Sequence, residues 1–546
     1  MKIIIVGGVA GGASAAVRLR RLDEDAEIIL IEKGSFVSFA NCGLPYHISD
    51  VTPENLLQVQ TPKSLHSRFN IDVRINNEVL SIDAAGKSVL IRELLTGREY
   101  RESYDKLVLA PGASAIRPGF VKTGNDKRVF SLKDIPDATE IRKLVETQKG
   151  GKAVVIGGGF IGLEAAENLA LAGMDTTVIE LTDHIMQQVD ADMGKLVKNE
   201  FEKHGVHVCV NERVEEVTSD ESAVHVRTDK GSYDADIVIL SLGVRPATSF
   251  IGDAVTLNEK GAIITDPSMR TSDPDIYAVG DAVITVNPMN EEYMYTPLAG
   301  PANRQGRIAA DNICGIPSEY RGTYGTSIMK VFDKTVARTG LSEKDAYNYE
   351  KSYTLPMNHA SYYPGAKGMI MKLIFDLDTG ILLGAQIFGE DGVDKRIDVL
   401  STAIQNQMTV DEISELELAY APPYGSAKDP VNLAAFTADN ILTGLVKVFH
   451  WHDVKDLVEN GEYLLDVRTQ REFDNGHIKG SAHVPLDEIR GRLSELPKDR
   501  TIYLYCQAGL RGYLACRILS QKGFDCVNLS GGYGLYSQLT KEYIEK

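Results

Sequence analysis

A single cysteine lies in a stretch of small and turn-forming residues near the N-terminus, Ser38-Phe39-Ala40-Asn41-Cys42-Gly43. The next cysteine along the chain is Cys209, so Cys42 has no neighbouring thiol with which to form a disulfide. A thiolate attacks a sulfur–sulfur bond through a mixed disulfide. If Cys42 carries out redox chemistry, its sulfur partner therefore comes from outside the chain.

A second cysteine begins the loop Cys506-Gln507-Ala508-Gly509-Leu510-Arg511, which lies between a predicted strand and a predicted helix. Backbone N–H groups in such a loop point inward and lower the pKa of a cysteine at its head. Arg511 adds positive charge. The pattern predicts a nucleophilic Cys506 assisted by Arg511. We assign no role to the other four cysteines, Cys209, Cys314, Cys516 and Cys526.

The composition limits the class of protein. A chain of 546 residues should contain several domains. The 58 Lys and Arg against 76 Asp and Glu give a net charge of −18, which argues against nucleic-acid or anionic-membrane binding but permits a local basic pocket. We see no signal peptide, no apolar run of the ~18 residues needed to span a bilayer, and no metal-ligand spacing among the cysteines. We therefore expect a cytoplasmic protein with reduced thiols and no metal.

The elements that position Cys42 begin with a βαβ pattern. A β-branched run at 2–6 leads into the glycine-rich turn Gly7–Gly12, a helical stretch at 13–21 and a second strand at 27–31. Glycines let the backbone approach a pyrophosphate, and Glu32 at the end of the second strand can accept ribose hydroxyls. Val9 takes the place of the second glycine of G-x-G-x-x-G. The pattern predicts a dinucleotide site.

The same pattern recurs at 152–180. A strand at 152–156 precedes an unbroken G-x-G-x-x-G, Gly157–Gly162, followed by a helix at 163–172 and a strand at 176–179 that ends on Glu180. A carboxylate there favours a ribose 2′-hydroxyl and repels a 2′-phosphate, and Leu181-Thr182-Asp183 supplies no base. Two dinucleotide folds predict FAD in the first and a nicotinamide in the second, with NADH preferred over NADPH.

With these motifs in order, residues 1–445 resemble the pyridine nucleotide–disulfide oxidoreductases, specifically the branch of coenzyme A-disulfide reductases and NADH-dependent persulfide (polysulfide) reductases. The most specific motifs are Ser38–Cys42 and Tyr420-Ala421-Pro422-Pro423-Tyr424, and they are supported by His359–Gly365 and Asp394–Val399. The resemblance implies that Cys42 cycles between a thiol and a mixed disulfide with coenzyme A. It also implies a homodimer in which Tyr362 and Tyr420 serve Cys42 of the partner subunit as proton donors.

The resemblance carries three sets of binding residues onto this chain. The FAD contacts implied are Gly7, Gly8, Ala10, Gly11, Gly12, Glu32, Lys33, Asn41, Ala110, Asp281, Pro297 and Ala299. The NAD contacts implied are Gly157, Gly159, Phe160, Ile161, Gly162, Glu180 and Gly243. The coenzyme A contacts implied are Ser14, Arg18, Arg21, Ser38, Asn41, Arg68, Asn303 and Lys428. Relatives have a lysine just after the Arg68 position, where this chain has Phe69, and some have histidine at Asn303.

The last hundred residues resemble rhodanese (sulfurtransferase) domains. The likeness is carried by Asp466-Val467-Arg468, by Gly476-His477-Ile478-Lys479-Gly480 and by the loop from Cys506 to Arg511. It implies that Cys506 carries sulfane sulfur as a persulfide.

We therefore expect an α/β protein with two Rossmann-like domains, an α+β dimerisation domain and a C-terminal α/β rhodanese domain. The predicted bounds are 1–148 with 254–321 for FAD, 149–253 for NAD, 322–445 for dimerisation and 446–546 for rhodanese.

The predicted function is an NADH-dependent FAD enzyme that reduces sulfur–sulfur bonds of coenzyme A persulfide, polysulfide or coenzyme A disulfide. One alternative is an NADH oxidase or peroxidase in which Cys42 cycles through a sulfenic acid. The other is a non-enzymatic sulfur-relay or redox-sensing flavoprotein. The physiological acceptor, the direction of sulfur transfer between Cys506 and Cys42, and the tightness of coenzyme A binding stay open at this point.

Overall fold

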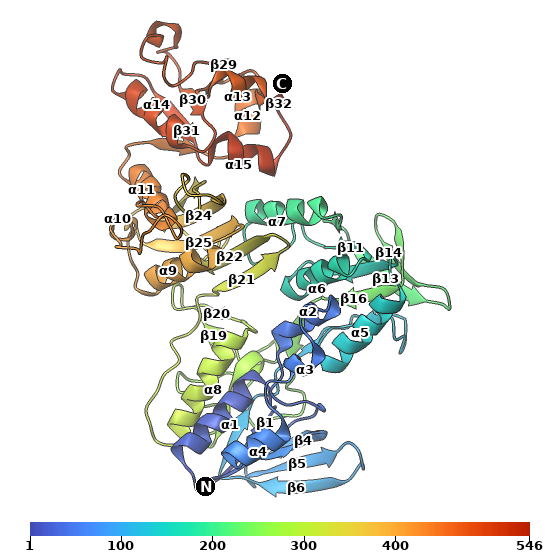
Figure 1. The fold of residues 1–546 in the computed structure, drawn as a ribbon. Coiled ribbons are helices and arrows are strands. Elements are labelled where there is room, and N and C mark those ends of the chain that lie inside the picture. Colours follow the sequence, from blue (N-terminus) through green and yellow to red (C-terminus); the bar gives the residue numbers. More distant parts are fainter. The chain divides into compact units, whose positions relative to one another are not determined.

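The computed structural model describes residues 1–546. The chain divides into two compact units, which we describe separately (Figure 1). The first unit comprises Met1–Asp183 and Gly205–Thr323, and the second comprises His184–His204 and Tyr324–Lys546.

The first unit begins with a five-stranded parallel sheet in the order β18-β7-β1-β2-β3. Its strands and covering helices are β1 (Lys2–Val6), α1 (Ala10–Leu22), β2 (Glu27–Ile31), β3 (Asp72–Arg74), β7 (Lys106–Leu109), β18 (Ile276–Ala278) and α8 (Ala299–Ile313). Strand order reverses on either side of β1, so the β1–α1 turn lies where a doubly wound sheet binds its ligand.

A second parallel sheet in the same unit repeats this design in the order β12-β11-β10-β16-β9. Its elements are β9 (Val129–Phe130), β10 (Lys152–Ile156), α6 (Phe160–Leu171), β11 (Asp175–Ile179), β12 (His207–Cys209) and β16 (Ile237–Leu240). Each sheet also has a three-stranded antiparallel meander inserted in the chain between two of its strands. The meander between β3 and β7 consists of β4 (Asn77–Asp83), β5 (Ser88–Glu93) and β6 (Glu99–Ser103), and the one between β12 and β16 consists of β13 (Val214–Ser219), β14 (Val224–Thr228) and β15 (Ser232–Ala235).

Shorter elements complete the first unit. They are η1 (Asn41–Gly43), α2 (Leu44–Ile48), α3 (Glu54–Leu57), α4 (Pro62–Phe69), β8 (Ala113–Ala115), α5 (Ile135–Thr147), β17 (Val244–Pro246), η2 (Gly280–Ala282), β19 (Thr285–Val286) and β20 (Tyr293–Met294). The chain passes from the first Rossmann-like sheet to the second through β8 and returns through β17. These two strands pair with each other in antiparallel fashion.

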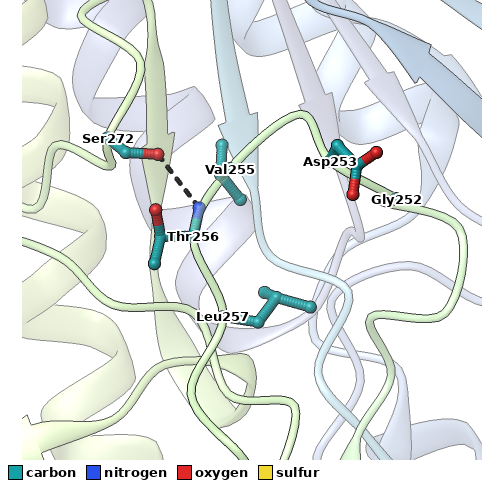
Figure 2. A pocket seen from close by; sticks show the side chains of 6 residues that line it. All are labelled: Gly252, Asp253, Val255, Thr256, Leu257 and Ser272. Atoms are coloured by element: carbon teal, nitrogen blue, oxygen red, sulfur yellow. Dashed lines mark hydrogen bonds between the residues drawn. The ribbon is translucent and has the colours of Figure 1, made fainter.

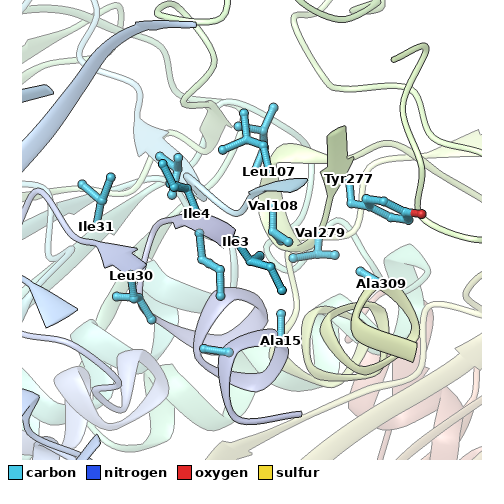
Figure 3. Close-up of a cluster of buried hydrophobic side chains, with 14 of the residues drawn as sticks. Ile3, Ile4, Ala15, Leu30, Ile31, Leu107, Val108, Tyr277, Val279 and Ala309 are labelled. Atoms are coloured by element: carbon cyan, nitrogen blue, oxygen red, sulfur yellow. The ribbon is translucent and has the colours of Figure 1, made fainter. Parts of the chain in front are cut away.

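The core of the first sheet is made by β-branched and leucine side chains on both faces of its strands (Figure 3). Ile3, Ile4 and Leu30 are fully buried, and Ala15 of α1 and Ala309 of α8 pack against the same cluster. The close approach of these two helices requires glycine, because a Cβ on Gly306 would lie 2.3 Å from the Gly11 carbonyl oxygen. Small residues thus bring α8 against the helix that opens the glycine-rich turn.

The second unit contains an antiparallel sheet in the order β21-β22-β25-β24-β23. Its elements are α7 (Ala191–Lys203), β21 (Ser327–Val331), β22 (Lys334–Gly340), β23 (Tyr349–Thr354), β24 (Met369–Asp376), β25 (Leu382–Gly389), α9 (Val393–Gln405), α10 (Val410–Ser414) and α11 (Pro430–Leu442).

An internal ion cluster joins α7 to this sheet. The Lys372 side chain is fully buried, and its ammonium lies 2.7 Å from Asp190 and 3.0 Å from Asp192 and also contacts Glu343. These three carboxylates lie close enough to hold a metal ion, but the lysine ammonium occupies the centre of the group. Buried charges persist only when they are paired, so this cluster helps to hold His184–His204 against the sheet of the second unit.

The rest of the second unit is a five-stranded parallel sheet in the order β26-β31-β30-β27-β29. The elements of this region are β26 (Lys447–Phe449), α12 (Val454–Glu459), β27 (Tyr463–Asp466), α13 (Gln470–Asp474), β28 (His477–Ile478), β29 (Ala482–His483), η3 (Leu493–Glu495), β30 (Ile502–Tyr505), α14 (Leu510–Ser520), β31 (Cys526–Leu529), α15 (Gly532–Leu539) and β32 (Ile544–Glu545). Strands β28 and β32 form a separate antiparallel pair.

The predicted fold class is confirmed, with two Rossmann-like sheets, an α+β region and a C-terminal α/β region. The predicted helices at 13–21 and 163–172 start three residues too late, because the glycine motifs themselves form the first turns of α1 and α6. The predicted domain bounds remain a prediction. No helix combines the length and the apolar character that crossing a membrane would require.

Candidate active site

The two glycine-rich turns have the same local geometry. Gly7 and Gly157 have φ angles of +96° and +105°, and a Cβ on either would lie within 2.2 Å of the carbonyl oxygen of the residue that directly follows the neighbouring strand. A side chain at Gly12 or Gly162 would meet the carbonyl of the first glycine, at 1.9 and 2.1 Å respectively. Only glycine fits these positions, and the exposed backbone that results is a cradle for a pyrophosphate.

Each turn also has an acidic side chain held in the same way. Glu32 accepts hydrogen bonds from the backbone of Gly8 (2.8 Å) and Gly34 (2.7 Å). Glu180 accepts them from Gly158 (2.7 Å) and Thr182 (2.9 Å). Both carboxylates therefore lie beside the glycine turn, where ribose hydroxyls of a bound dinucleotide would be.

The other residues predicted to bind FAD lie around the first sheet. Ala10 and Gly11 open α1, Ala110 follows β7, Asn41 lies in η1, and Pro297 and Ala299 lie at the start of α8. Lys33 is exposed and pairs with Glu78 at 2.7 Å. The Asp281 carboxyl, in η2, makes no hydrogen bond or ion pair within the chain, and burial raises its pKa. The backbone carbonyl of the same residue accepts a hydrogen bond from the Tyr295 hydroxyl at 2.7 Å. An unpartnered, largely desolvated carboxyl fits a group that hydrogen-bonds to hydroxyls, as a flavin side chain would.

The remaining residues predicted to bind NAD surround the second sheet. Gly159 caps α6, and Phe160 and Ile161 form its first turn with Ile161 42% exposed. Gly243 precedes β17 and has a φ angle of +88°.

Cys42 lies in η1, directly before α2, and its thiol is accessible to solvent. The turn that leads to it is strained, since Ser38 has a φ angle of +49° and is held by its N–H bond to the Gly8 carbonyl (2.7 Å). This bond ties the cysteine segment directly to the glycine-rich turn. Desolvation and the charges of Glu164 and Asp281 raise the pKa of Cys42.

Two residues near Cys42 were not identified from the sequence. The Tyr46 hydroxyl, on α2, donates to the Glu164 carboxylate on α6 at 3.2 Å. Burial raises the pKa of Glu164 to about 7. Glu164 sits two residues after the last glycine of the second motif, a spacing that places it on the first turns of α6, but nothing in the sequence indicates that α2 faces it. The pair links the cysteine segment to the helix of the second dinucleotide fold.

Five of the residues predicted to bind coenzyme A line one pocket: Ser14, Arg18, Arg21, Ser38 and Asn303. The pocket has a volume of ≈ 340 Å³ and is lined by Ala13, Ser14, Val17, Arg18, Arg21, Ser38, Gln60, Leu65, Asn303 and Arg307. Arg18 is paired with Asp311 at 2.6 Å, whereas the exposed Arg21 and Arg307 make no ion pair closer than 3.9 Å. Asn303, on α8, accepts a hydrogen bond from Ser14 on α1. The pocket thus offers two available cations to an anionic ligand.

Other predicted contacts are not part of this pocket's lining. Asn41 and Arg68 lie outside it in the first unit, and Lys428 lies in the second unit before α11. The sequence prediction missed Gln60 and Arg307. Arg307 lies one helical turn after Asn303, so a helix assignment there could have indicated it.

A further hollow in the first unit contains none of the predicted residues (Figure 2). It has a volume of ≈ 460 Å³ and is lined by Gly252, Asp253, Val255, Thr256, Leu257 and Ser272. The Thr256 N–H donates to the Ser272 hydroxyl at 2.9 Å. We assign no ligand to it.

In the second unit, Tyr362 and Tyr420 are brought together although they are 58 residues apart. Their hydroxyl oxygens are 2.8 Å apart, and the side chains are 74% and 47% exposed. A tyrosine with the ordinary pKa of 10 is already protonated at neutral pH, and the hydrogen bond to Tyr420 raises the pKa of Tyr362 further.

The C-terminal cysteine loop is formed at the end of β30. Cys506 is buried, and its sulfur accepts a hydrogen bond from the Gly509 backbone at 3.1 Å. Arg511, on the first turn of α14, forms a two-pronged ion pair with Glu472. One backbone N–H of the loop thus points at the Cys506 sulfur. That Cys506 is a nucleophile remains a prediction.

Comparison with known proteins agrees with this arrangement of two dinucleotide cradles and one cysteine. Residues 1–306 match the model of the pyridine nucleotide-disulphide oxidoreductases, and residues 326–430 match the dimerisation domain of the same family. The chain belongs to this family. Residues 450–538 match the rhodanese-like domain. The chain is therefore a flavin- and nicotinamide-dependent oxidoreductase of the disulfide reductase type with a fused sulfurtransferase domain, as the motifs predicted.

Three relatives illustrate how far the similarity extends. A coenzyme A disulfide reductase from Staphylococcus haemolyticus is 35% identical over 448 residues, which cover 81% of this chain and 100% of that protein. The crystal structure of reduced Bacillus anthracis CoADR-RHD superposes with a TM-score of 0.96 at 44% identity, covering 100% of this chain and 99% of that one. A NAD-dependent persulfide reductase from A. fulgidus gives a TM-score of 0.92 at 37% identity, covering 98% and 100%.

Proposed function

We propose that this oxidoreductase uses NADH to cleave sulfur–sulfur bonds in coenzyme A persulfide, polysulfide or coenzyme A disulfide, with Cys42 as the attacking thiol. The observation that carries the proposal is the strained Ser38–Cys42 turn, which is hydrogen-bonded to the first glycine cradle and contributes Ser38 to a pocket containing Arg21 and Arg307. The relatives named coenzyme A disulfide reductase and NAD-dependent persulfide reductase act on substrates of this kind.

FAD would be held by the first cradle with Glu32 and Asp281, and NADH by the second cradle with Glu180. Bound FAD supplies two-electron transfer between the nicotinamide and sulfur. The roles of Lys33, Asn41, Ala110, Pro297 and Ala299 toward FAD, and of Phe160, Ile161 and Gly243 toward NAD, are part of this proposal.

The chemistry of the chain's own residues follows from the thiol. The Cys42 thiolate attacks the coenzyme A-side sulfur of CoA–S–SH, so that the S–S bond of the substrate breaks and HS⁻ leaves. The product is a mixed disulfide, Cys42–S–S–CoA. Two electrons and one proton then convert it to the Cys42 thiolate and the thiol of coenzyme A. With coenzyme A disulfide, the first leaving group is the coenzyme A thiolate instead.

The pocket lined by Arg21 and Arg307 would hold the phosphates of coenzyme A, because guanidinium groups bind phosphate oxygens in pairs. Arg18 would contact the ligand as well, and its ion pair with Asp311 would hold this wall of the pocket in place. The match to the dimerisation domain supports a homodimer. In such a dimer the Tyr362–Tyr420 pair would protonate the thiolate that leaves Cys42 of the other subunit.

Cys506 would carry sulfane sulfur as a persulfide, and the fused domain favours persulfide or polysulfide over coenzyme A disulfide as the substrate. A pure disulfide reductase, or an oxidase that acts on oxygen, has no use for a sulfur carrier.

The test is NADH consumption by the purified holoenzyme with coenzyme A persulfide, inorganic polysulfide and coenzyme A disulfide as substrates. Sulfide release is measured for the first two, and release of the coenzyme A thiol for the third. Cys42→Ser should abolish turnover of all three while FAD remains bound, and Cys314→Ser should behave as the wild type. A coenzyme A adduct should be detected by mass spectrometry on the Cys42 peptide. Retained turnover in Cys42→Ser would contradict the proposal, and NADH-dependent oxygen uptake without sulfide release would favour the oxidase alternative.

A further inference from the structure

The cation of the rhodanese loop is neutralised by a carboxylate from another element. Arg511 donates through Nη1 and Nη2 to the two oxygens of Glu472, at 2.8 and 2.6 Å. The side chains are 32% and 31% exposed, so the pair is only partly screened by water. Because the guanidinium fork matches both carboxylate oxygens, Arg511 is committed to Glu472.

Glu472 is itself fixed in place. Its Oε2 accepts hydrogen bonds from the Thr469 N–H at 3.0 Å and the Thr469 hydroxyl at 2.8 Å. The first of these bonds belongs to the capping box of α13. The ion pair with Arg511 and these donors outweigh desolvation and hold the pKa of Glu472 at about 2. The carboxylate is therefore ionised throughout the neutral range.

The other arginine beside the loop is neutralised as well. Arg468 donates through Nε and Nη2 to Asp466 at 2.9 and 2.7 Å, and both side chains are buried. The Nη1 group of Arg468 donates to the Gln507 side-chain oxygen in the loop at 3.3 Å. Thus Arg511, which ends the loop, and Arg468, which contacts it, are each paired with an acidic side chain.

The surface next to the loop is apolar. Leu510 and Leu514 lie one helical turn apart on α14, and they are 67% and 44% exposed. Exposed leucines beside a reactive cysteine suit a donor with an organic moiety, and they contribute nothing to binding a small dianion.

We propose that the Glu472–Arg511 pair makes Cys506 selective for sulfane sulfur from organic persulfides and against thiosulfate. This inference rests on the proposed carrier role of Cys506. The Cys506 thiolate attacks the terminal sulfur of R–S–SH, the S–S bond of the donor breaks, and the leaving thiolate takes up the proton: R–S–SH + Cys506–S⁻ → R–SH + Cys506–S–S⁻. No net oxidation occurs. With thiosulfate the leaving group is the sulfite dianion, whose negative charge needs a nearby cation for stabilisation. Arg511 would be that cation, but it is already paired with Glu472.

The test measures loading of Cys506 in the holoenzyme without NADH, with glutathione persulfide or thiosulfate as the donor. The readout is the mass of one added sulfur on the alkylated peptide that contains Cys506. The variant is Glu472→Gln, which can still accept the Thr469 hydrogen bonds but removes the charge. Glu495→Gln is the matched control, because it removes a carboxylate from another arginine pair of the same domain, Arg492–Glu495.

We expect the wild type to be loaded faster by the persulfide. Glu472→Gln should raise the thiosulfate rate about tenfold and leave the persulfide rate within about twofold, because a single nearby charge is worth at least this factor. Glu495→Gln should change neither rate. An unchanged donor ratio in Glu472→Gln, or an equal change in Glu495→Gln, would overturn the donor preference alone. Absence of loading by both donors in the wild type would overturn the carrier role and the preference together.

Discussion

The hydroxyl groups of Tyr362 and Tyr420 are hydrogen-bonded to each other at 2.8 Å on an exposed surface of the second unit. Exposed phenols gain little stability from such a bond, so we expect the pairing to matter for the proposed chemistry rather than for folding. Because each hydroxyl orients the other, the two residues should act together in protonating a leaving thiolate.

Tyr362→Phe and Tyr420→Phe should therefore each lower the rate of sulfide release at least tenfold, since general acid catalysis contributes about 10²–10⁴-fold. The double variant should be little worse than either single variant. Steady-state rates with coenzyme A persulfide measure this. Tyr424→Phe is the matched control, because Tyr424 is 74% exposed on the same segment. Additive losses in the double variant would show that the two phenols act independently.

Glu164→Gln should lower the pKa of the Cys42 thiol. The negative charge of Glu164 helps to raise that pKa, after desolvation, and Gln has no charge. In the wild type Glu164 ionises as the pH rises through about 7, so its effect on Cys42 is present above this value and absent below it. The rate of Cys42 alkylation as a function of pH, followed on the Cys42 peptide, should shift to lower pH in the variant. A profile identical to that of the wild type would show that the two groups do not interact.

The same carboxyl affects stability with the opposite sign from most acids. Its folded pKa of about 7 lies above the ordinary value of 4.5, so the folded state binds more protons and the free energy of unfolding falls as the pH rises between these values. Glu164→Gln should flatten this part of the pH–stability curve. Thermal unfolding at several pH values would measure it.

Glu180→Ala should narrow the preference for NADH over NADPH by about tenfold or more, because the carboxylate beside the second cradle repels a 2′-phosphate. The comparison of kcat/KM for the two nicotinamides is the measurement. Asp175→Ala, an exposed acid at the start of β11, is the control. An unchanged ratio would show that Glu180 does not determine the preference for NADH over NADPH.

Lys372→Met should destabilise the second unit by about 3–5 kcal/mol, because three carboxylates would lose their buried counter-ion. Lys334→Met should cost less than about 1 kcal/mol, since its pair with Glu390 is near the surface. Calorimetry of the holoenzyme would separate the two variants.

Acid should affect this ion cluster in a defined direction. Burial by itself would raise the pKa of Glu343, but Lys372 and Lys351 outweigh it and lower the value to about 2. The stability from Glu343 is therefore present above pH 4.5 and lost as the pH falls toward 2. Lys372→Met should weaken this acid dependence, and a variant with unchanged stability and pH dependence would contradict our account of the cluster.

Much of the first unit could be predicted from the sequence because its signals are local. The strands Glu27–Ile31 and Lys152–Ile156 were predicted with the bounds that the structure has. Gly7 and Gly157 need φ angles that other residues rarely adopt, and Glu32 and Glu180 follow at a spacing set by one strand–helix–strand unit. The loop from Cys506 to Arg511 is also a contiguous segment, so its position between β30 and α14 was predictable.

The tertiary structure decided which charges are available. Arg18 and Arg21 are alike in sequence, yet Asp311, 293 residues away on α8, pairs with Arg18 and leaves Arg21 exposed. Arg307 enters the same pocket because Gly11 and Gly306 let α1 and α8 touch.

For the cysteines, the sequence by itself determined that Cys42 has no internal partner and that Cys506 heads a loop. Only the tertiary structure placed Glu164 and Asp281 near Cys42 and Glu472 on Arg511. The physical reason is that a backbone motif is specified by its own residues, whereas the charge around a sulfur is the sum over side chains brought together from distant parts of the chain.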